Sequence, residues 1–176
     1  MRDTQRQRLY NAETQVGTQL DYAAAGARMV HVAGSTLTLP LELRFGSWEA
    51  AVGYVDAVRA SAAFARRWPG AARAPVRVRR RAGNRAAHYE PPGTIALHAP
   101  PTGTAWSLRE LVVLHEVAHH AVHHDGAGDP GHGPEYATVL LALIGDVMGP
   151  EVALLLTTAF ADHGVAFSAP LTTRTA

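Results

Sequence analysis

The residues best suited to chemistry are histidines: six of the chain's ten lie between Leu111 and Tyr136, in the stretch LVVLHEVAHHAVHHDGAGDPGHGPEY. Within it, His115, Glu116 and His119 form the pattern H-E-x-x-H. Residues four apart on an α-helix lie on one face about 5–6 Å apart, so both imidazoles can bind one metal ion. Glu116 then stands beside the ion, where a general base can accept a proton from a metal-activated water. The spacing predicts a catalytic metal site.

The surroundings of this pattern favour a zinc site over histidines that merely fill a core. Apolar residues flank it on both sides: Leu108, Leu111, Val112, Val113, Leu114, Val117 and Val122. Two histidines and a glutamate are costly to bury in such a helix unless a partner satisfies them. The chain has no cysteine, which excludes a thiolate zinc site, a disulfide and a cysteine nucleophile. Because imidazole suits zinc, we expect one Zn2+ per chain.

A catalytic zinc site takes three protein ligands and keeps one position open, so a third ligand is needed. His132 follows the loop DGAGDPG, which can turn back over the helix and leads directly into the next helix start. Glu135, in the first turn of that next helix, would give a glutamate-liganded site. Asp125 lies six residues after His119, but Val122 stands where such a zincin pattern needs glycine. We expect His132 to be the third ligand, with Glu135 and Asp125 as alternatives.

The segments HEVAHH and GHGPEY together resemble the SprT-like metalloproteases, in which an H-E-x-x-H helix is followed by an H-G-P-x-[FW]-type segment. The run GTIALHAPPTGTAWSLRELVVLHEVAHH is similar to the edge strand and active-site helix of that group. The resemblance covers residues 90–148. It implies His115, His119 and His132 as zinc ligands and Glu116 as the catalytic residue.

The chain departs from the SprT-like pattern in two ways. Tyr136 stands where phenylalanine or tryptophan is commoner, and a chain without cysteine cannot carry the C-terminal zinc ribbon of many members. The resemblance therefore does not imply their DNA-linked protease activity. Over its full length, including the opening RDTQRQRLYNAE, the chain also resembles a set of short actinobacterial metallohydrolases of uncharacterised activity.

Several polar residues near the pattern are candidates for supporting roles. His123, four residues past His119 on the same helix face, fits a pocket rim or a contact to the transition state. Asp125 and Asp129 are candidates to accept a hydrogen bond from the second ring nitrogen of a ligand. Tyr136 fits a place in the core better than a role as oxyanion donor.

The other histidines of this region are expected outside the metal site. His120 and His124 fall on another face of the helix, where we expect them to be solvated. His98 ends the strand predicted before the helix, so a substrate that pairs with that strand at a sheet edge would contact it.

These residues predict a zinc metallohydrolase, in the first place a metallopeptidase that uses Glu116 as general base on a peptide or protein substrate. One alternative is a zinc-stabilised binding module without catalysis, which would contact nucleic acid through the arginine-rich segment Arg73–Arg85. Another is a hydrolase of a non-peptide amide. The glutamate in the motif argues against a purely structural site, which needs no base and fills its fourth position.

The chain predicts one α+β domain over residues 1–168, zincin-like, with a small mixed or antiparallel sheet packed on helices, and a flexible tail at 169–176. The predicted helices span 4–25, 47 to the Trp-Pro-Gly stop at 68–70, a histidine helix opened by a capping box at 107–110, a helix from 134 and a helix from 150 to 164. The predicted strands span 29–33, 37–45, 76–80, 87–90 and 94–98.

Composition gives weaker indications. The formal net charge is +1, all sixteen basic residues are arginine, and six of them lie in Arg73–Arg85. We interpret that segment as a solvated hairpin with Val76 and Val78 facing inward. The polar N-terminus resembles no signal peptide, and no apolar run reaches the length of a membrane span, so we expect a cytoplasmic protein without membrane contact.

Overall fold

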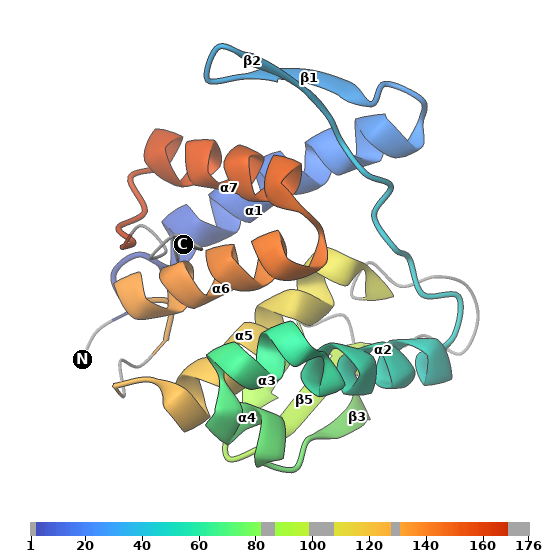
Figure 1. The fold of residues 1–176 in the computed structure, drawn as a ribbon, viewed down its shortest axis with the longest axis vertical. Coiled ribbons are helices and arrows are strands. Elements are labelled where there is room, and N and C mark those ends of the chain that lie inside the picture. The colour runs from blue at the N-terminus through green and yellow to red at the C-terminus, as the bar shows by residue number, and fades with distance from the viewer. Residues whose placement is uncertain (1–2, 82–86, 99–107, 128–130, 169–176) are drawn as a thin grey trace.

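The computed structural model describes residues 3–81, 87–98, 108–127 and 131–168. The fold combines helices with small sheets in an α+β arrangement, as the sequence predicts (Figure 1). In order these are α1 (Arg6–Ala24), β1 (Met29–Val32), β2 (Ser35–Thr38), α2 (Trp48–Ala60), α3 (Ala62–Arg67), α4 (Pro69–Arg73), β3 (Arg77–Arg81), β4 (His88–Glu90), β5 (Thr94–His98), α5 (Glu110–Asp125), α6 (Pro134–Val147) and α7 (Pro150–Asp162). The predicted tail at 169–176 lies outside the described residues.

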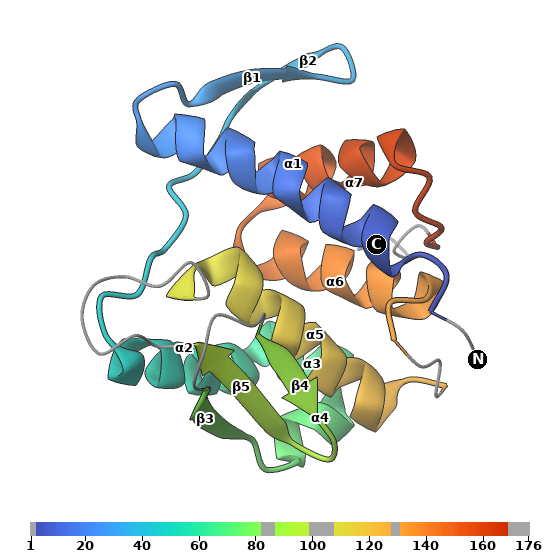
Figure 2. The same ribbon diagram turned by 180° about the vertical axis from the view of Figure 1, so that it is seen from behind.

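The histidine helix α5 lies in the middle of the fold, and the other elements pack around it (Figures 1 and 2). On one side, α6 packs on α5, α7 packs on α6, and α1 packs on α7. On the other side, α5 contacts α4, α2 and the strands β4 and β5. Eleven of its sixteen residues are buried, including His115 and Glu116. Because α5 is covered on several sides, its side chains are held in place by the whole domain.

The sheet next to α5 is mixed, in the strand order β3-β5-β4. Strand β3 pairs in parallel with β5, and β4 pairs with β5 in antiparallel register, with Tyr89 opposite Ile95. The predicted hairpin within Arg73–Arg85 is therefore wrong, because its strand pairs with β5 instead of with its neighbour in sequence. The strand 94–98, expected at an edge, is central, since Ile95, Ala96 and Leu97 are all buried.

A short hairpin, β1–β2, follows α1, and its two-residue turn places Ala33 at φ 50° and Gly34 at φ 78°. The strand predicted over 37–45 is wrong beyond Thr38, although its edge character fits. Pro40 has no N–H for a ladder, and the chain instead runs as an irregular strap from the hairpin towards α2. Along this strap Leu39 and Phe45 are buried, whereas Leu41 and Leu43 are exposed.

The long helix predicted from Ser47 to residue 68 is divided into two, α2 and α3, and a third short helix, α4, follows it. Ser47 caps α2 by accepting from Ala50 N, as predicted, but α2 ends at Ala60. Ser61 has the extended backbone of a cap, and its hydroxyl accepts from Phe64 N at the start of α3. The residues expected to stop the helix begin a new one, because Pro69 occupies the first position of α4.

The start of α5 is capped by a distant residue. The predicted capping box is wrong, because α5 begins at Glu110, and Ser107 lies outside the described residues. Glu42 of the strap accepts from Leu111 N (3.2 Å) and from the Arg109 guanidinium (2.6 Å). Its side chain is only 1% exposed. A buried carboxylate from another part of the chain thus satisfies the first turn of the histidine helix.

Glu110 ties the strap to α5 from the other direction. Its carboxylate accepts from Leu43 N and from the Tyr54 hydroxyl, and its own N–H donates to Leu43 O. Phe45 N donates to Leu108 O, which closes the contact.

The two predicted helices that follow are confirmed, since α6 and α7 each begin with proline after glycine. Among the described residues, no helix has both the length and the apolar character needed to cross a bilayer.

Candidate metal centre

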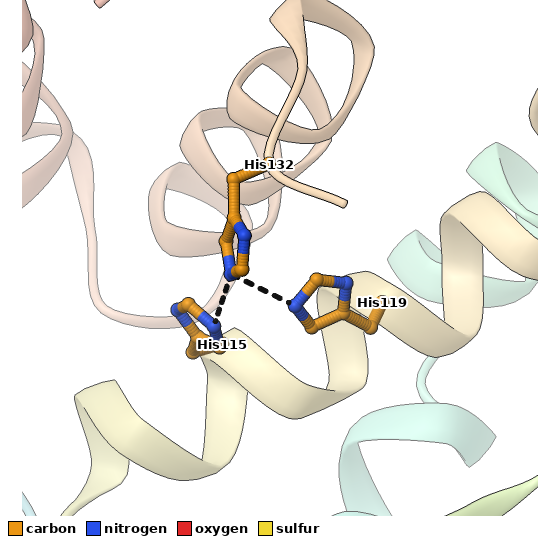
Figure 3. A group of neighbouring side chains, drawn as sticks. All are labelled: His115, His119 and His132. Atoms are coloured by element: carbon orange, nitrogen blue, oxygen red, sulfur yellow. Dashed lines mark hydrogen bonds between the residues drawn. The ribbon is translucent and has the colours of Figure 1, made fainter. Parts of the chain in front are cut away.

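Three histidines converge in the space between α5 and the start of α6 (Figure 3). His132 Nε2 lies 3.2 Å from His115 Nε2 and 3.3 Å from His119 Nε2. Two nitrogens bound to one zinc ion at 2.0–2.1 Å with tetrahedral angles are about 3.3–3.4 Å apart. The spacing of the three rings therefore fits a single metal ion, and the group could hold one.

Carboxylates behind two of the rings fix which nitrogen faces the centre. His115 Nδ1 lies 2.8 Å from Glu13 Oε1, and His132 Nδ1 lies 2.7 Å from Asp3 Oδ2. A carboxylate accepts the Nδ1 proton, so each ring turns the lone pair of Nε2 inwards, which is the common arrangement of metal-binding histidines. The Nε2 atoms of His115 and His132, 3.2 Å apart with their lone pairs directed inwards, could bind one cation together.

The loop that carries His132 is held by the segment before α1. Gln5, only 4% exposed, donates to His132 O (2.8 Å), and its amide also pairs with the backbone of Ala166 through both N–H and C=O. Asp3 Oδ2 additionally accepts from His132 N (3.2 Å). Gly131 has φ +83°, and a Cβ there would lie 2.6 Å from the Asp3 carboxylate. The position of His132 thus depends on residues at the opposite end of the chain.

Burial keeps two of the three imidazoles neutral. It lowers the pKa of His119 to about 2, with the neighbouring His115 and His132 adding to the effect. Burial also lowers the pKa of His132, against the opposing effect of Asp3. For His115 burial acts in the same direction, but Glu13 outweighs it and raises the pKa. Neutral imidazoles are the form that binds a metal.

Glu116, next to His115 in the sequence, is buried beside the three histidines. Its side chain is 2% exposed, and its Oε2 has no hydrogen-bond partner among the described residues. Burial raises its pKa to about 7, although the backbone N–H of Tyr89 partly opposes this. It lines, together with His115, a cavity of about 430 Å3 between α1 and α5. A buried carboxylate with one oxygen unpaired, at a cavity beside three converging imidazoles, points to function rather than packing.

No protein-family model, curated protein or solved structure matches the chain.

Three tyrosines surround the histidines. The ring of Tyr136 lies 4.2 Å from that of His119, and its buried hydroxyl donates to His115 O, which is a place in the core. Tyr10 of α1 lies 5.6 Å from His115 and 5.1 Å from His132. Tyr89 of β4 stacks on His119 at 6.4 Å. The rings of Tyr10 and Tyr89 thus cover the group from α1 and from the sheet.

The two alternative third ligands serve other purposes in the structure. Glu135 Oε1 accepts from Ala127 N (2.7 Å), a bond that closes the end of the loop after α5. Asp125 accepts from Gly70 N (2.9 Å) and Ala71 N (2.7 Å) at the start of α4. Neither carboxylate belongs to the three-histidine group. Glu135 and Asp125, the alternative third ligands, therefore bond to loop and helix-start backbone instead of joining the group. His132 is the residue that lies next to His115 and His119.

The supporting residues are distributed differently from expectation. His123 is exposed, and its ring lies 5.9 Å from Tyr89. Asp129 lies outside the described residues, and Asp125 does not reach a ligand nitrogen. His98 ends the central strand β5, so the expected contact with a substrate at that edge is not supported by the sheet order.

The prediction that His120 is solvated is wrong. His120 is fully buried, donates from Nε2 to Ala71 O (3.0 Å), and has its Nδ1 3.2 Å from the Tyr89 hydroxyl. Burial lowers its pKa to about 4. His124 is half-buried, with Nε2 2.7 Å from Pro92 O. The His120 ring joins α5 to α4 and β4, and the His124 ring joins α5 to the turn after β4.

Sequence reasoning missed the residues that support the site from α1 and the segment before it: Asp3, Gln5, Tyr10 and Glu13. Their partners lie more than one hundred residues away along the chain, as with Glu13 and His115, which are separated by 102. The available signal was the presence of carboxylates next to the apolar stripe of the first helix. That signal is too common on surface helices to identify a ligand's partner.

Proposed function

We propose that this protein is a zinc-dependent metallohydrolase, and that it hydrolyses peptide bonds in the manner of the SprT-like proteases. The observation that carries the proposal is the combination of three converging Nε2 atoms with the buried carboxylate of Glu116, whose Oε2 has no partner among the described residues, at a cavity. His115, His119 and His132 would hold the ion, and three protein ligands leave a position open for a substrate.

A bound zinc ion would supply Lewis acidity, polarising a carbonyl and lowering the pKa of water towards about 7. Glu116 accepts a proton from the attacking water and returns it to the leaving amine. Burial raises the pKa of this carboxyl to about 7 in the metal-free protein, and a bound cation would lower it, so the ionised base would be present near neutral pH. We propose Tyr10 as the hydrogen-bond donor to the oxyanion, because its ring lies 5.6 Å from that of His115 and its hydroxyl, which accepts from Arg6 Nε (3.3 Å), keeps its own proton.

The edge strand β4 offers a docking line for an extended peptide. Within the described part of the sheet, β4 pairs only with β5, so its other edge has no strand partner, and a peptide that paired there would compete with Glu116 for the Tyr89 N–H. The backbone N–H of Tyr89 in β4 is close enough to Glu116 to affect its pKa. A peptide paired along β4 would therefore pass directly beside the proposed base.

The nucleic-acid alternative draws less support from the arginine-rich segment. Arg79 forms a two-point ion pair with Glu90, and Arg80 lies 3.6 Å from Glu49. Arg81 contacts His88. The carboxylates of Glu90 and Glu49 neutralise part of the positive charge that phosphate binding would use. Hydrolysis of a non-peptide amide would use the same residues and is distinguished by substrate screening.

The test compares Glu116→Gln with the wild type, both purified without added metal. We expect about one zinc per chain in each protein by elemental analysis, and loss of casein and peptide hydrolysis in the variant only. Glu135→Gln is the matched control, because it removes a nearby carboxylate outside the group and should keep both zinc and activity. His132→Ala should lose the zinc. Equal turnover by Glu116→Gln and the wild type would refute the mechanism.

A further inference from the structure

The cavity that begins at the proposed metal site continues between α1 and the first turns of α5. Its wall on α1 runs along one helix face from Tyr10 to Asp21. At a rise of 1.5 Å per residue this wall is about 16 Å long. On α5 the wall consists of Leu111 and Val112 and ends at His115. The volume of about 430 Å3 lies within the range of small-molecule sites.

The middle of the cavity is apolar. Thr14 and Thr18 line it, but their hydroxyls donate back to carbonyl groups of α1 at 2.8 and 3.0 Å, which leaves their methyl groups as free surface. Leu111, Val112 and Ala87 complete this part of the wall. Apart from the Glu13 carboxylate, which lines the end near the histidines and is paired with His115, an occupant therefore meets mainly carbon atoms of the described residues.

The charged residues at the far end are already paired. Arg109 is held by the buried Glu42 and donates to Gly17 O (3.2 Å). Asp21 lies 3.1 Å from Arg109 and also pairs with Arg44. These pairs close the end of the cavity without leaving an unpaired ion among the described residues there. A charged group of a ligand would have to displace an existing ion pair, so the cavity favours an uncharged, apolar occupant.

Gly17 keeps the space open at the centre of α1. It is buried within a helix, where glycine is less favourable than alanine. A Cβ at this position would lie 3.5 Å from the Arg109 guanidinium. Any longer side chain at this position would have to enter the gap between α1 and α5.

We infer that this cavity binds a large aliphatic or aromatic side chain of the substrate, at a residue next to the bond that is cleaved. The inference rests on the proposed function, because it takes His115 and Glu116 as the place of reaction. Peptides with leucine or phenylalanine at that residue are then preferred over those with alanine or with a charged side chain.

A series of n-alkyl hydroxamates, from acetohydroxamate to octanohydroxamate, separates the metal from the cavity. The hydroxamate binds zinc, and the alkyl chain measures the apolar space. On the zinc-loaded wild type we expect the affinity, measured by calorimetry, to rise about fourfold for each methylene that enters the cavity. Gly17→Leu fills the cavity and should abolish this dependence. Gly53→Leu is the matched control, since Gly53 is an exposed helix glycine with nothing within 4 Å.

Val112→Phe fills the cavity from the α5 wall and replaces Gly17→Leu if that variant does not fold. The inference is supported if the dependence on chain length is lost in the filled variant and kept in Gly53→Leu. It is overturned if acetohydroxamate binds and longer chains gain nothing, or if wild type and filled variant gain equally. In both of those cases the proposed function survives.

If acetohydroxamate does not bind to zinc-loaded protein, the proposed function fails instead. The cavity is then tested alone by titrating octanamide, which needs no metal, into the metal-free protein while the Gly17 amide resonance is followed. A saturable shift that is absent in Val112→Phe supports an apolar binding cavity. No shift in the wild type overturns it.

Discussion

Replacing Glu13 tests whether the carboxylate behind His115 supports metal binding. The contact is 2.8 Å long, and both side chains are nearly buried, with 8% of His115 and 13% of Glu13 exposed. A hydrogen bond to a charged group contributes about 1.5–3 kcal/mol and a neutral one about 0.5–1.5 kcal/mol. Glu13→Gln keeps an acceptor and loses the charge, so it should cost about 1–1.5 kcal/mol, or about 5–12-fold in zinc affinity. Glu13→Ala loses both and should cost about 10–150-fold.

The zinc dissociation constant is measured by competition with a chromophoric chelator at fixed pH and ionic strength. Glu49→Gln is the control, because it removes the same charge from an exposed helix position whose carboxylate lies 3.6 Å from Arg80. We expect its zinc affinity to equal that of the wild type. If Glu13→Ala binds zinc as tightly as Glu49→Gln, the carboxylate does not orient His115, and the role assigned to α1 in the metal centre is wrong.

Three further predictions concern residues around the site. Tyr10→Phe should retain zinc and lower kcat by about 10²-fold, as expected for loss of an oxyanion donor, and unchanged kcat would exclude that role. Asp125→Ala should lower the free energy of unfolding by about 1 kcal/mol, through loss of the cap on α4, without changing zinc content; loss of zinc would reinstate it as a ligand. Tyr54→Phe removes a hydrogen bond to the buried Glu110 and should cost about 1.5–3 kcal/mol in urea unfolding, where an unchanged midpoint would contradict the contact.

Local spacing in the sequence was sufficient to predict the part of the site that lies on α5. His115 and His119 face one way because they are four apart on a helix, and the helix forms where its apolar residues predict it. His132 was predicted because a loop and a proline-led helix start fix its position, and the structure brings it to the other two. The helix and the helix start depend on interactions between residues close in sequence, which a single chain reveals, whereas the contacts of Asp3 and Gln5 that hold His132 do not.

The contacts that cross the fold could not be predicted in the same way. The alternation over 37–45 predicted a strand, but the buried Glu42 is used to cap α5, and the exposed Leu41 and Leu43 show that alternate residues do not share one covered face. His120 was expected in water because helical periodicity identifies one apolar face, whereas α5 is covered from several directions. Such tertiary contacts override local preference, and their partners have no fixed spacing.

The clamp on His132 links metal loading to the order in which the protein folds. Gln5 joins residues 127 and 161 positions away, and Asp3 reaches across 129 positions. Contacts between such distant residues form late, because the entropy of closing long loops must be overcome first. During synthesis the residues of α5 emerge before Ala166, so the pairing of Gln5 with Ala166, which supports the His132 loop, forms only afterwards. A nascent chain would thus pass through a stage with two histidines in place, and high-affinity metal capture would follow completion of the fold instead of guiding it.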